Sequence, residues 1–332
     1  MKNNKTKHMV DFQSLNRTDP IARDFWAYGA ASIAMTWMKA TPGNEYVIEG
    51  LENLPREPAI VAMNHSHMFD FLALRAPLLF KGHTFVSWVK ARNYRSPAMA
   101  AFLARTGNVP ICSRGYIIAA DYFELFGERM GEDEYRSLRD HVDTGVELPP
   151  GKRYDIIQSR ARPMLGWGFN ASGMTYRDAI QGVYAGFMQT SMRLTRQGIN
   201  RGDKVHIYPQ GTVASRLTRG RPGVIQAALA FGLPIVTVGV SGAREGYVAT
   251  TPRPRRNAGK IVVRIGETLH VDRSDFPSDF KPFDHAHERL YDDALMRHTD
   301  RVMGSLNALL DEDERLDPTE DVALKKGLKR FF

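Results

Sequence analysis

The sequence predicts an α/β protein with a mostly parallel central sheet flanked by helices, an N-terminal helix and a helical insertion. Short apolar runs bounded by turn residues alternate with longer segments of helical periodicity, as in a layered α/β fold. A polar loop also follows directly after one apolar run, where parallel sheets place functional side chains. We expect strands at 46–49, 59–63, 84–89, 108–112, 204–208, 235–240 and 260–265, and helices at 21–38, 69–79, 97–105, 177–197, 222–231 and 284–310.

Residues 1–43 are expected to form an N-terminal arm and an amphipathic helix. The uncharged stretch from Phe25 to Met38 has 14 residues, fewer than the roughly 18 to 20 that cross a bilayer as a helix. Its Trp26 and Trp37 suit a helix lying in the membrane interface, while packing on the protein body explains it equally well. Acidic residues separate the basic start from this stretch, which disfavours a cleaved signal peptide.

The most informative loop follows the apolar run 59–63. It places His65 five residues before Asp70, and a helix opening at Phe69 would carry Asp70 in its first turn. The carboxylate could then hold one imidazole nitrogen and leave the other free to accept a proton from a hydroxyl. The alternatives are that Asp70 caps the helix and that His65 is an ordinary loop residue. His67 is a rival base at a different spacing from Asp70.

This loop, preceded by Asn64, resembles the first motif of the glycerolipid acyltransferases, the family of lysophosphatidic acid and glycerol-3-phosphate acyltransferases. Three further motifs follow in the order of that family: 107–114 (GNVPICSR), 208–212 (YPQGT) and 233–238 (LPIVTV). The resemblance implies an acyltransferase domain over 44–272. It also implies acyl transfer from acyl-CoA or an acyl carrier protein to a hydroxyl of a lysophospholipid or glycerol phosphate.

The site residues implied by the resemblance divide into two groups. His65 would be the general base, and Asp70 would orient it. A second group would bind substrate, with Arg114 and the backbone near Gly211 and Thr212 holding the acceptor phosphate. No metal ion is expected, and no cofactor beyond the acyl donor. The substrate-binding group is Asn64, Arg114, Gln210, Gly211, Thr212 and Arg216.

The third motif departs from the family pattern at two positions. Gln210 stands where the family usually has glutamate, and Val213 stands where it usually has arginine. A neutral amide cannot act as a carboxylate, and valine cannot pair with phosphate. Arg216 and its basic neighbours could supply the charge, or they could form an exposed basic loop. The departures leave open a non-phosphate or amino-lipid acceptor, and also a catalytically weakened lipid-binding pseudoenzyme.

Two segments lie outside the minimal pattern of the family. Residues 115–175 form an insertion between the second motif and the helix that leads to the third. Within it, 116–142 is expected to form a helical hairpin and the glycine-rich 166–173 a loop. The insertion is expected to form a lid or a wall of the acyl or acceptor pocket, and the alternative is a peripheral or oligomer-forming addition. Residues 273–332 are expected to form a C-terminal helical segment and a basic tail, and Gly198 to end the preceding long helix.

Charge distribution points to anionic partners. The formal net charge is +8 over 332 residues. Eleven Lys or Arg and two acidic residues lie in 201–264, whereas 265–332 carry 10 basic and 16 acidic residues. A basic face around the third motif suits an anionic membrane surface or the phosphates of a substrate. No nucleic-acid-binding motif is evident, so nucleic acid is not expected as a partner.

The expected location is cytoplasmic, peripheral on the membrane. The single cysteine, Cys112, excludes an intramolecular disulfide and suits a reducing compartment. It lies in an apolar strand context and is expected to be a buried hydrophobic residue rather than a nucleophile.

Overall fold

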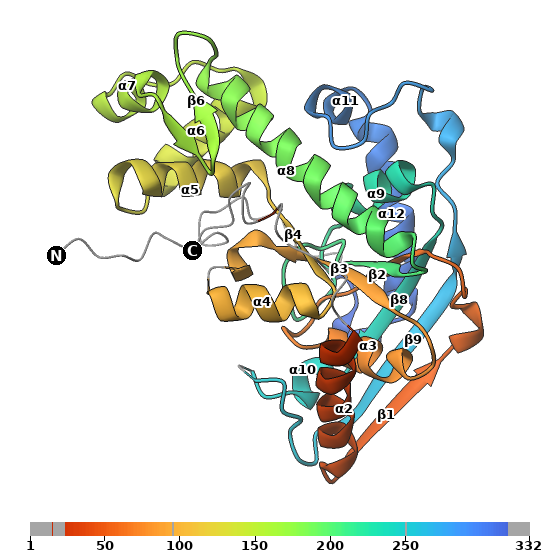
Figure 1. Ribbon diagram of the computed structural model, residues 1–332. Helices are drawn as coiled ribbons and strands as arrows, with labels where there is room; N and C mark the ends of the chain where they lie inside the picture. Colours follow the sequence, from red (N-terminus) through yellow and green to blue (C-terminus); the bar gives the residue numbers. More distant parts are fainter. Residues whose placement is uncertain (1–14, 16–23, 95, 250, 318–332) are drawn as a thin grey trace, which may run out of the picture.

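A seven-stranded sheet organises the protein in the computed structural model, which describes residues 15, 24–94, 96–249 and 251–317 (Figure 1). Its strand order is β1-β9-β8-β2-β7-β3-β4. The strands are β1 (Asn44–Glu49), β2 (Ile60–Met63), β3 (Phe85–Lys90), β4 (Asn108–Ile111), β7 (Lys204–Ile207), β8 (Ile235–Ser241) and β9 (Gly259–Leu269). Each overlaps one of the strands expected from the apolar runs, and the predicted α/β class is confirmed.

The middle of the sheet is parallel. Neighbours from β8 to β4 all pair in parallel, β9 runs antiparallel to β8, and β1 pairs in parallel with β9. Parallel pairing brings the carboxyl ends of β2 and β7 to the same edge, with Ala62 opposite Ile207. The two loops that follow these strands, which carry the first and third motifs, therefore meet at that edge.

Strand β2 lies at the centre because its side chains are apolar on both faces. Ile60 and Ala62 join the larger core cluster, and Val61 and Met63 join the smaller one on the opposite face. All four are fully buried, as expected for a strand covered on both sides.

Helices cover both faces of the sheet. On one face, α8 (Tyr176–Ile199) packs on β3, β4 and β7, and α9 (Gly223–Phe231) and α12 (Asp292–Ala308) pack on β2. On the other, α3 (Phe71–Leu79) and α10 (Ala243–Gly246) contact β9, and α2 (Asp24–Ala40) packs on α3. Helix α4 (Pro97–Arg105) joins β3 to β4. Short 3-10 turns lie at Leu51–Asn53, Ala91–Tyr94, Arg273–Asp275 and Glu312–Glu314.

The insertion gathers around the first half of α8, away from α2 and β1 (Figure 1). Its hairpin consists of α5 (Arg114–Phe126) and α6 (Glu132–Thr144), and α7 (Lys152–Ser159) follows. The predicted helical hairpin is confirmed. The expectation of a loop at 166–173 is wrong in part, because β5 (Arg162–Met164) and β6 (Trp167–Phe169) form an antiparallel hairpin there.

Two predicted helix boundaries are also wrong. Gly198 does not end α8 but lies inside its last turn, where a Cβ would come within 3.1 Å of Val86 Cβ and 2.9 Å of Asp203 Oδ2. A glycine is needed there for close packing against β3. The helix expected at 284–310 is interrupted at Tyr291 and forms α11 (His285–Leu290) and α12.

Helix α2 has a packed side and an open side. Ala31 and Ala34 pack against Ala76 of α3, whereas Ile33 is 55% exposed and Trp37 39% exposed. The side chain of Trp26 and the basic C-terminal tail predicted from the sequence lie outside the described residues. Within the described part of the chain, no helix combines the length and apolarity needed to cross a membrane.

Candidate active site

His65 and Asp70 meet in the loop between β2 and α3. The Nδ1 atom of His65 lies 3.0 Å from Oδ2 of Asp70. Asp70 is fully buried, while the side chain of His65 keeps 18% of its surface exposed. Because Asp70 engages Nδ1, Nε2 is the ring nitrogen left to accept a proton. The structure thus brings together the two residues that the sequence singled out.

Asp70 does not cap α3, although it holds the N-cap position. Its side chain accepts no hydrogen bond from the first turn of that helix. Instead, Oδ2 accepts from the His67 backbone N–H at 3.1 Å in addition to His65, and Oδ1 accepts from the Tyr208 hydroxyl at 2.7 Å. Three donors therefore converge on one buried carboxylate, which accepts hydrogen bonds at both of its oxygens. The alternative of a simple capping role therefore does not describe this residue.

His67 is arranged differently from His65. Its Nδ1 accepts a hydrogen bond from the Phe69 N–H at 3.1 Å, so the neutral ring carries its proton on Nε2. The residue is buried, and burial lowers the pKa of His67 below its usual range despite the opposing charge of Asp70. A neutral ring with Nδ1 already occupied and Nε2 protonated has no free nitrogen to accept a proton.

The side-chain amides of Asn64 and Gln210 both form hydrogen bonds with backbone groups. The amide of Asn64 donates to the Val240 carbonyl at 2.9 Å and accepts from the Val240 N–H at 2.7 Å, which ties the loop to β8. Gln210 accepts from the His65 N–H at 2.8 Å and donates toward the Arg216 carbonyl and Thr218 Oγ1, each at 3.3 Å. Both amides hold the histidine loop in place from inside the protein.

The third-motif loop wraps over the same edge. Gly211 adopts φ +69°, and its N–H donates to the Tyr208 carbonyl at 3.0 Å, so this amide closes a turn. Gly211 and Thr212 are half-buried. The side chain of Arg216 is 43% exposed and lies 3.7 Å from an Asp317 carboxylate oxygen.

Arg114 makes its contacts with the insertion and the C-terminal segment. Its guanidinium donates to Glu288 of α11 at 2.9 Å, lies 3.5 Å from Asp143 of α6, and stacks over the Tyr184 ring. Only 12% of its side chain is exposed. In the described part of the chain, Arg114 therefore lies in a half-buried ionic cluster, and its ionic and hydrogen-bond partners lie outside the histidine loop.

The sequence did not single out three residues near the His–Asp pair, of which His206 is buried and Tyr208 and Arg75 are half-buried. Tyr208 lies inside a quoted motif, which was the available signal. Arg75 of α3 donates to Ser87, Asn108 and the Thr106 carbonyl. His206 of β7 contacts Ser87 Oγ at 3.1 Å, and burial, together with the Arg75 charge, lowers the pKa of His206 well below its usual range.

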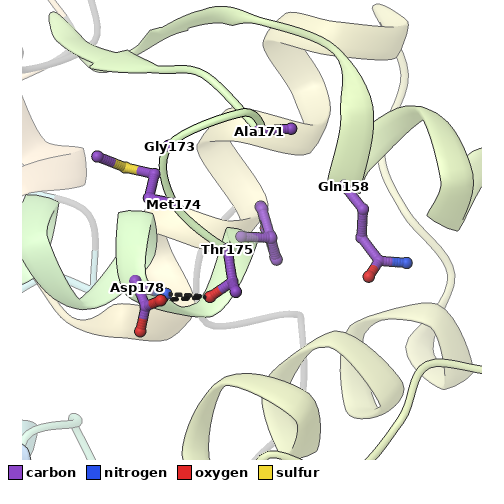
Figure 2. A pocket seen from close by; sticks show the side chains of 7 residues that line it. Gln158, Ala171, Gly173, Met174, Thr175 and Asp178 are labelled. Carbon is purple, nitrogen blue, oxygen red and sulfur yellow. Dashed lines mark hydrogen bonds between the residues drawn. The ribbon is translucent and has the colours of Figure 1, made fainter.

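Two surface hollows lie elsewhere. One, of about 500 Å³, lies at the tip of the insertion and is lined by Gln158, Met174, Thr175 and their neighbours (Figure 2). It contains none of the residues predicted for the site. The other, of about 190 Å³, lies between the end of α2 and the loop after β8, where Trp37, Arg253 and Arg256 line it.

The fold and this loop define an α/β protein with a buried carboxylate and a partly exposed histidine at the carboxyl edge of a parallel sheet. Residues 45–137, which include both groups, match the family model Acyltransferase. This match agrees with the resemblance predicted from the motif.

Comparisons with other proteins add a distant structural likeness. The crystal structure of the 1-acyl-sn-glycerophosphate (LPA) acyltransferase PlsC from Thermotoga maritima aligns with 83% of this chain and 78% of that one. The two share 14% sequence identity, with a TM-score of 0.39. A comparison with curated proteins found no match.

Proposed function

We propose that this protein transfers a fatty acyl chain from a thioester to a hydroxyl of a lysophospholipid or glycerol phosphate, with His65 as general base. The observation that carries this proposal is the contact between His65 Nδ1 and the buried Asp70 carboxylate, with 18% of the His65 side chain still exposed. Acyl-CoA and an acyl carrier protein are both proposed donors, and no metal or further cofactor takes part.

The proposed reaction is a direct transfer. The acceptor hydroxyl gives its proton to His65 Nε2 as its oxygen attacks the thioester carbonyl, and Asp70 stabilises the imidazolium that forms. The tetrahedral intermediate then expels the thiolate, which takes the proton from His65. General-base assistance of this kind contributes about 10²–10⁴-fold, so the remaining acceleration comes from positioning of the two substrates.

The acceptor phosphate is proposed to meet the third-motif loop. Arg216 is reachable from solvent, and its carbonyl accepts from the same Gln210 amide that holds the His65 backbone. Arg114 would have to leave Glu288 before it could bind another anion. For these reasons, Arg216 and Thr212 are better placed than Arg114 to meet the acceptor.

The protein is proposed to act at an anionic membrane surface from the cytoplasmic side. Supporting features are the exposed side chains of Ile33 and Trp37 on α2 and the arginines Arg253 and Arg256, which share a hollow with Trp37. Apolar and aromatic side chains beside basic ones suit the headgroup region of a bilayer.

A weakened lipid-binding pseudoenzyme is the second candidate, and it rests on the departures from the family pattern at Gln210 and Val213. Gln210 is 2% exposed and bonds to the protein through both ends of its amide. The Gln210 side chain has a structural role and does not face an open site. Having glutamine instead of glutamate here therefore removes no carboxylate from such a site. This placement favours the active enzyme.

A single assay tests the proposed function. Release of free thiol would be measured with acyl-CoA and with acyl carrier protein donors against a panel of lysophospholipids, glycerol phosphate and an amino-lipid. We expect acceptor-dependent thiol release with at least one phosphate-bearing acceptor. Release only with the amino-lipid would change the acceptor class, and binding to liposomes without release would favour the pseudoenzyme.

A further inference from the structure

We propose that Tyr208 is a positioning residue for the His65–Asp70 pair, acting through both its hydroxyl and its ring. This inference rests on the proposed function, because it assigns Tyr208 a part in the same proton transfer. Tyr208 follows β7, and Asp70 lies 138 positions earlier in the sequence. The sheet brings them together because β7 is the direct neighbour of β2.

The hydroxyl fixes one side of the carboxylate. It donates to Asp70 Oδ1 at 2.7 Å, while Oδ2 faces His65 and the His67 N–H. Burial and the adjacent charge of Asp70 raise the pKa of Tyr208 well above its usual range, so the phenol stays a neutral donor. A carboxylate held at both oxygens cannot rotate, and this fixes the direction from which it meets His65 Nδ1.

The ring fixes the imidazole. Tyr208 and His65 stack with centroids 3.8 Å apart and planes 20° from parallel. Stacking restricts rotation of the imidazole about its bond to Cβ. It also places an aromatic face against the ring that becomes an imidazolium during transfer, an arrangement that favours the cation.

The surrounding backbone makes this placement rigid. Two residues after Tyr208, Gln210 accepts from the His65 N–H, and Ala214 donates its N–H to the His65 carbonyl at 2.9 Å. One segment of chain therefore holds the backbone, the ring and, through Asp70, the Nδ1 atom of His65. Tyr208 is the member of this segment that reaches both halves of the pair.

The test compares three variants. Tyr208→Phe keeps the ring and removes the hydroxyl, and Tyr208→Leu removes both contacts. Tyr176→Phe is the matched control, because the Tyr176 hydroxyl is also buried but has no hydrogen-bond partner in the described structure and lies at the start of α8. Thermal unfolding would check that each variant folds.

The first readout is the kinetics of thiol release. We expect Tyr208→Phe to lower kcat about 10-fold or more, the effect of losing a hydrogen bond to a charged group that orients the base. KM should stay within about twofold, because Tyr208 does not bind the acceptor. Tyr208→Leu should lose more, and Tyr176→Phe should match the wild type.

The second readout needs no substrate. The ring ¹⁵N chemical shifts of His65, assigned from their loss in His65→Ala, report which nitrogen carries the proton. We expect a single Nδ1–H tautomer in the wild type and in Tyr176→Phe, and a mixture of tautomers in Tyr208→Phe. If the wild type releases no thiol, the proposed function fails while this measurement still decides the role of Tyr208.

Two outcomes would overturn the inference. The first is a wild-type tautomer in Tyr208→Phe, since the hydroxyl would then not orient the pair. The second is a changed tautomer with unchanged kcat in an active enzyme, since the orientation would then not matter for transfer.

Discussion

Gln210 Oε1 accepts a hydrogen bond from the His65 backbone N–H at 2.8 Å. The third motif therefore supports the first through a side chain, at the position where this chain departs from the family pattern. The other end of the same amide donates to the Arg216 carbonyl and Thr218. An amide can accept at one end and donate at the other, and a carboxylate has only acceptors.

Replacing Gln210 with Glu is expected to destabilise the fold without changing the acceptor. The new carboxylate would accept from the His65 N–H but would meet the Arg216 carbonyl with another acceptor, in a place that is 2% exposed. We expect a loss of about 1–3 kcal/mol in the free energy of unfolding, measured with urea. The ratio of activities on lysophosphatidic acid and other acceptors should not change. A changed ratio at unchanged stability would mean that Gln210 contacts the acceptor.

Binding to anionic liposomes is expected to depend on Trp37 and on the neighbouring arginines. Trp37→Ala removes an aromatic side chain from the open side of α2, and Arg253→Gln with Arg256→Gln removes two charges. We expect weaker co-sedimentation with vesicles containing phosphatidylserine, and a smaller effect of salt in the double arginine variant.

The controls for liposome binding come from other faces of the protein. Trp167→Ala removes a similarly exposed tryptophan from the insertion, and Arg136→Gln with Arg297→Gln removes the same charge elsewhere. These variants should bind like the wild type. Equal weakening of binding in the controls, or binding that does not change with salt concentration, would contradict this prediction. The exposed side chains of α2 and the two arginines would then have no part in membrane binding.

Glu314 is expected to make the stability of the protein depend on pH. Burial raises the pKa of Glu314 to about 7, and nearby acidic groups at Glu245, Asp313 and Asp311 add to this, against the hydrogen bond from the Gly242 N–H. Between its unfolded value, near 4.5, and about 7, the folded state binds more protons than the unfolded state. Its stabilising contribution is complete below pH 4.5 and is lost as the pH rises through 7.

Glu314→Gln isolates this contribution. Glutamine keeps the acceptor for Gly242 and carries no charge, so the variant should match the wild type near pH 5 and exceed its stability above pH 7. The full shift corresponds to about 3 kcal/mol. The measurement is the free energy of unfolding in urea at pH 5 and pH 8. The same change between the two pH values in the variant and the wild type would contradict the prediction.

The sheet and most helices could be predicted because their signals are local. Apolar runs such as 59–63 and the periodicity of α8 depend only on neighbouring residues. The hairpin of β5 and β6 was missed because Trp167 and Phe169 stand among glycines, which are typical of a loop. Gly198 was misjudged because its role depends on contact with Val86, far away in the sequence.

The same distinction applies to the candidate site. His65 and Asp70 lie five positions apart, so their contact follows from the loop itself. Partners in distant segments cannot be assigned from spacing. The bond between Asn64 and Val240 joins residues 176 positions apart, and that between Arg114 and Glu288 joins residues 174 apart. The contact of Tyr208 with Asp70 depends on the pairing of β7 with β2, which the sequence does not specify.

The most direct test of the proposed mechanism is the rate of thiol release by His65→Ala, measured with Asp70→Asn beside it. His141 of the insertion, which is half-buried, supplies the control His141→Ala. We expect His65→Ala to fall by at least about 10²-fold and Asp70→Asn to fall severely, because the base is lost in one and its orientation in the other. Both variants should still unfold cooperatively, and His141→Ala should keep the wild-type rate. Turnover near the wild-type rate in a folded His65→Ala protein would contradict the mechanism.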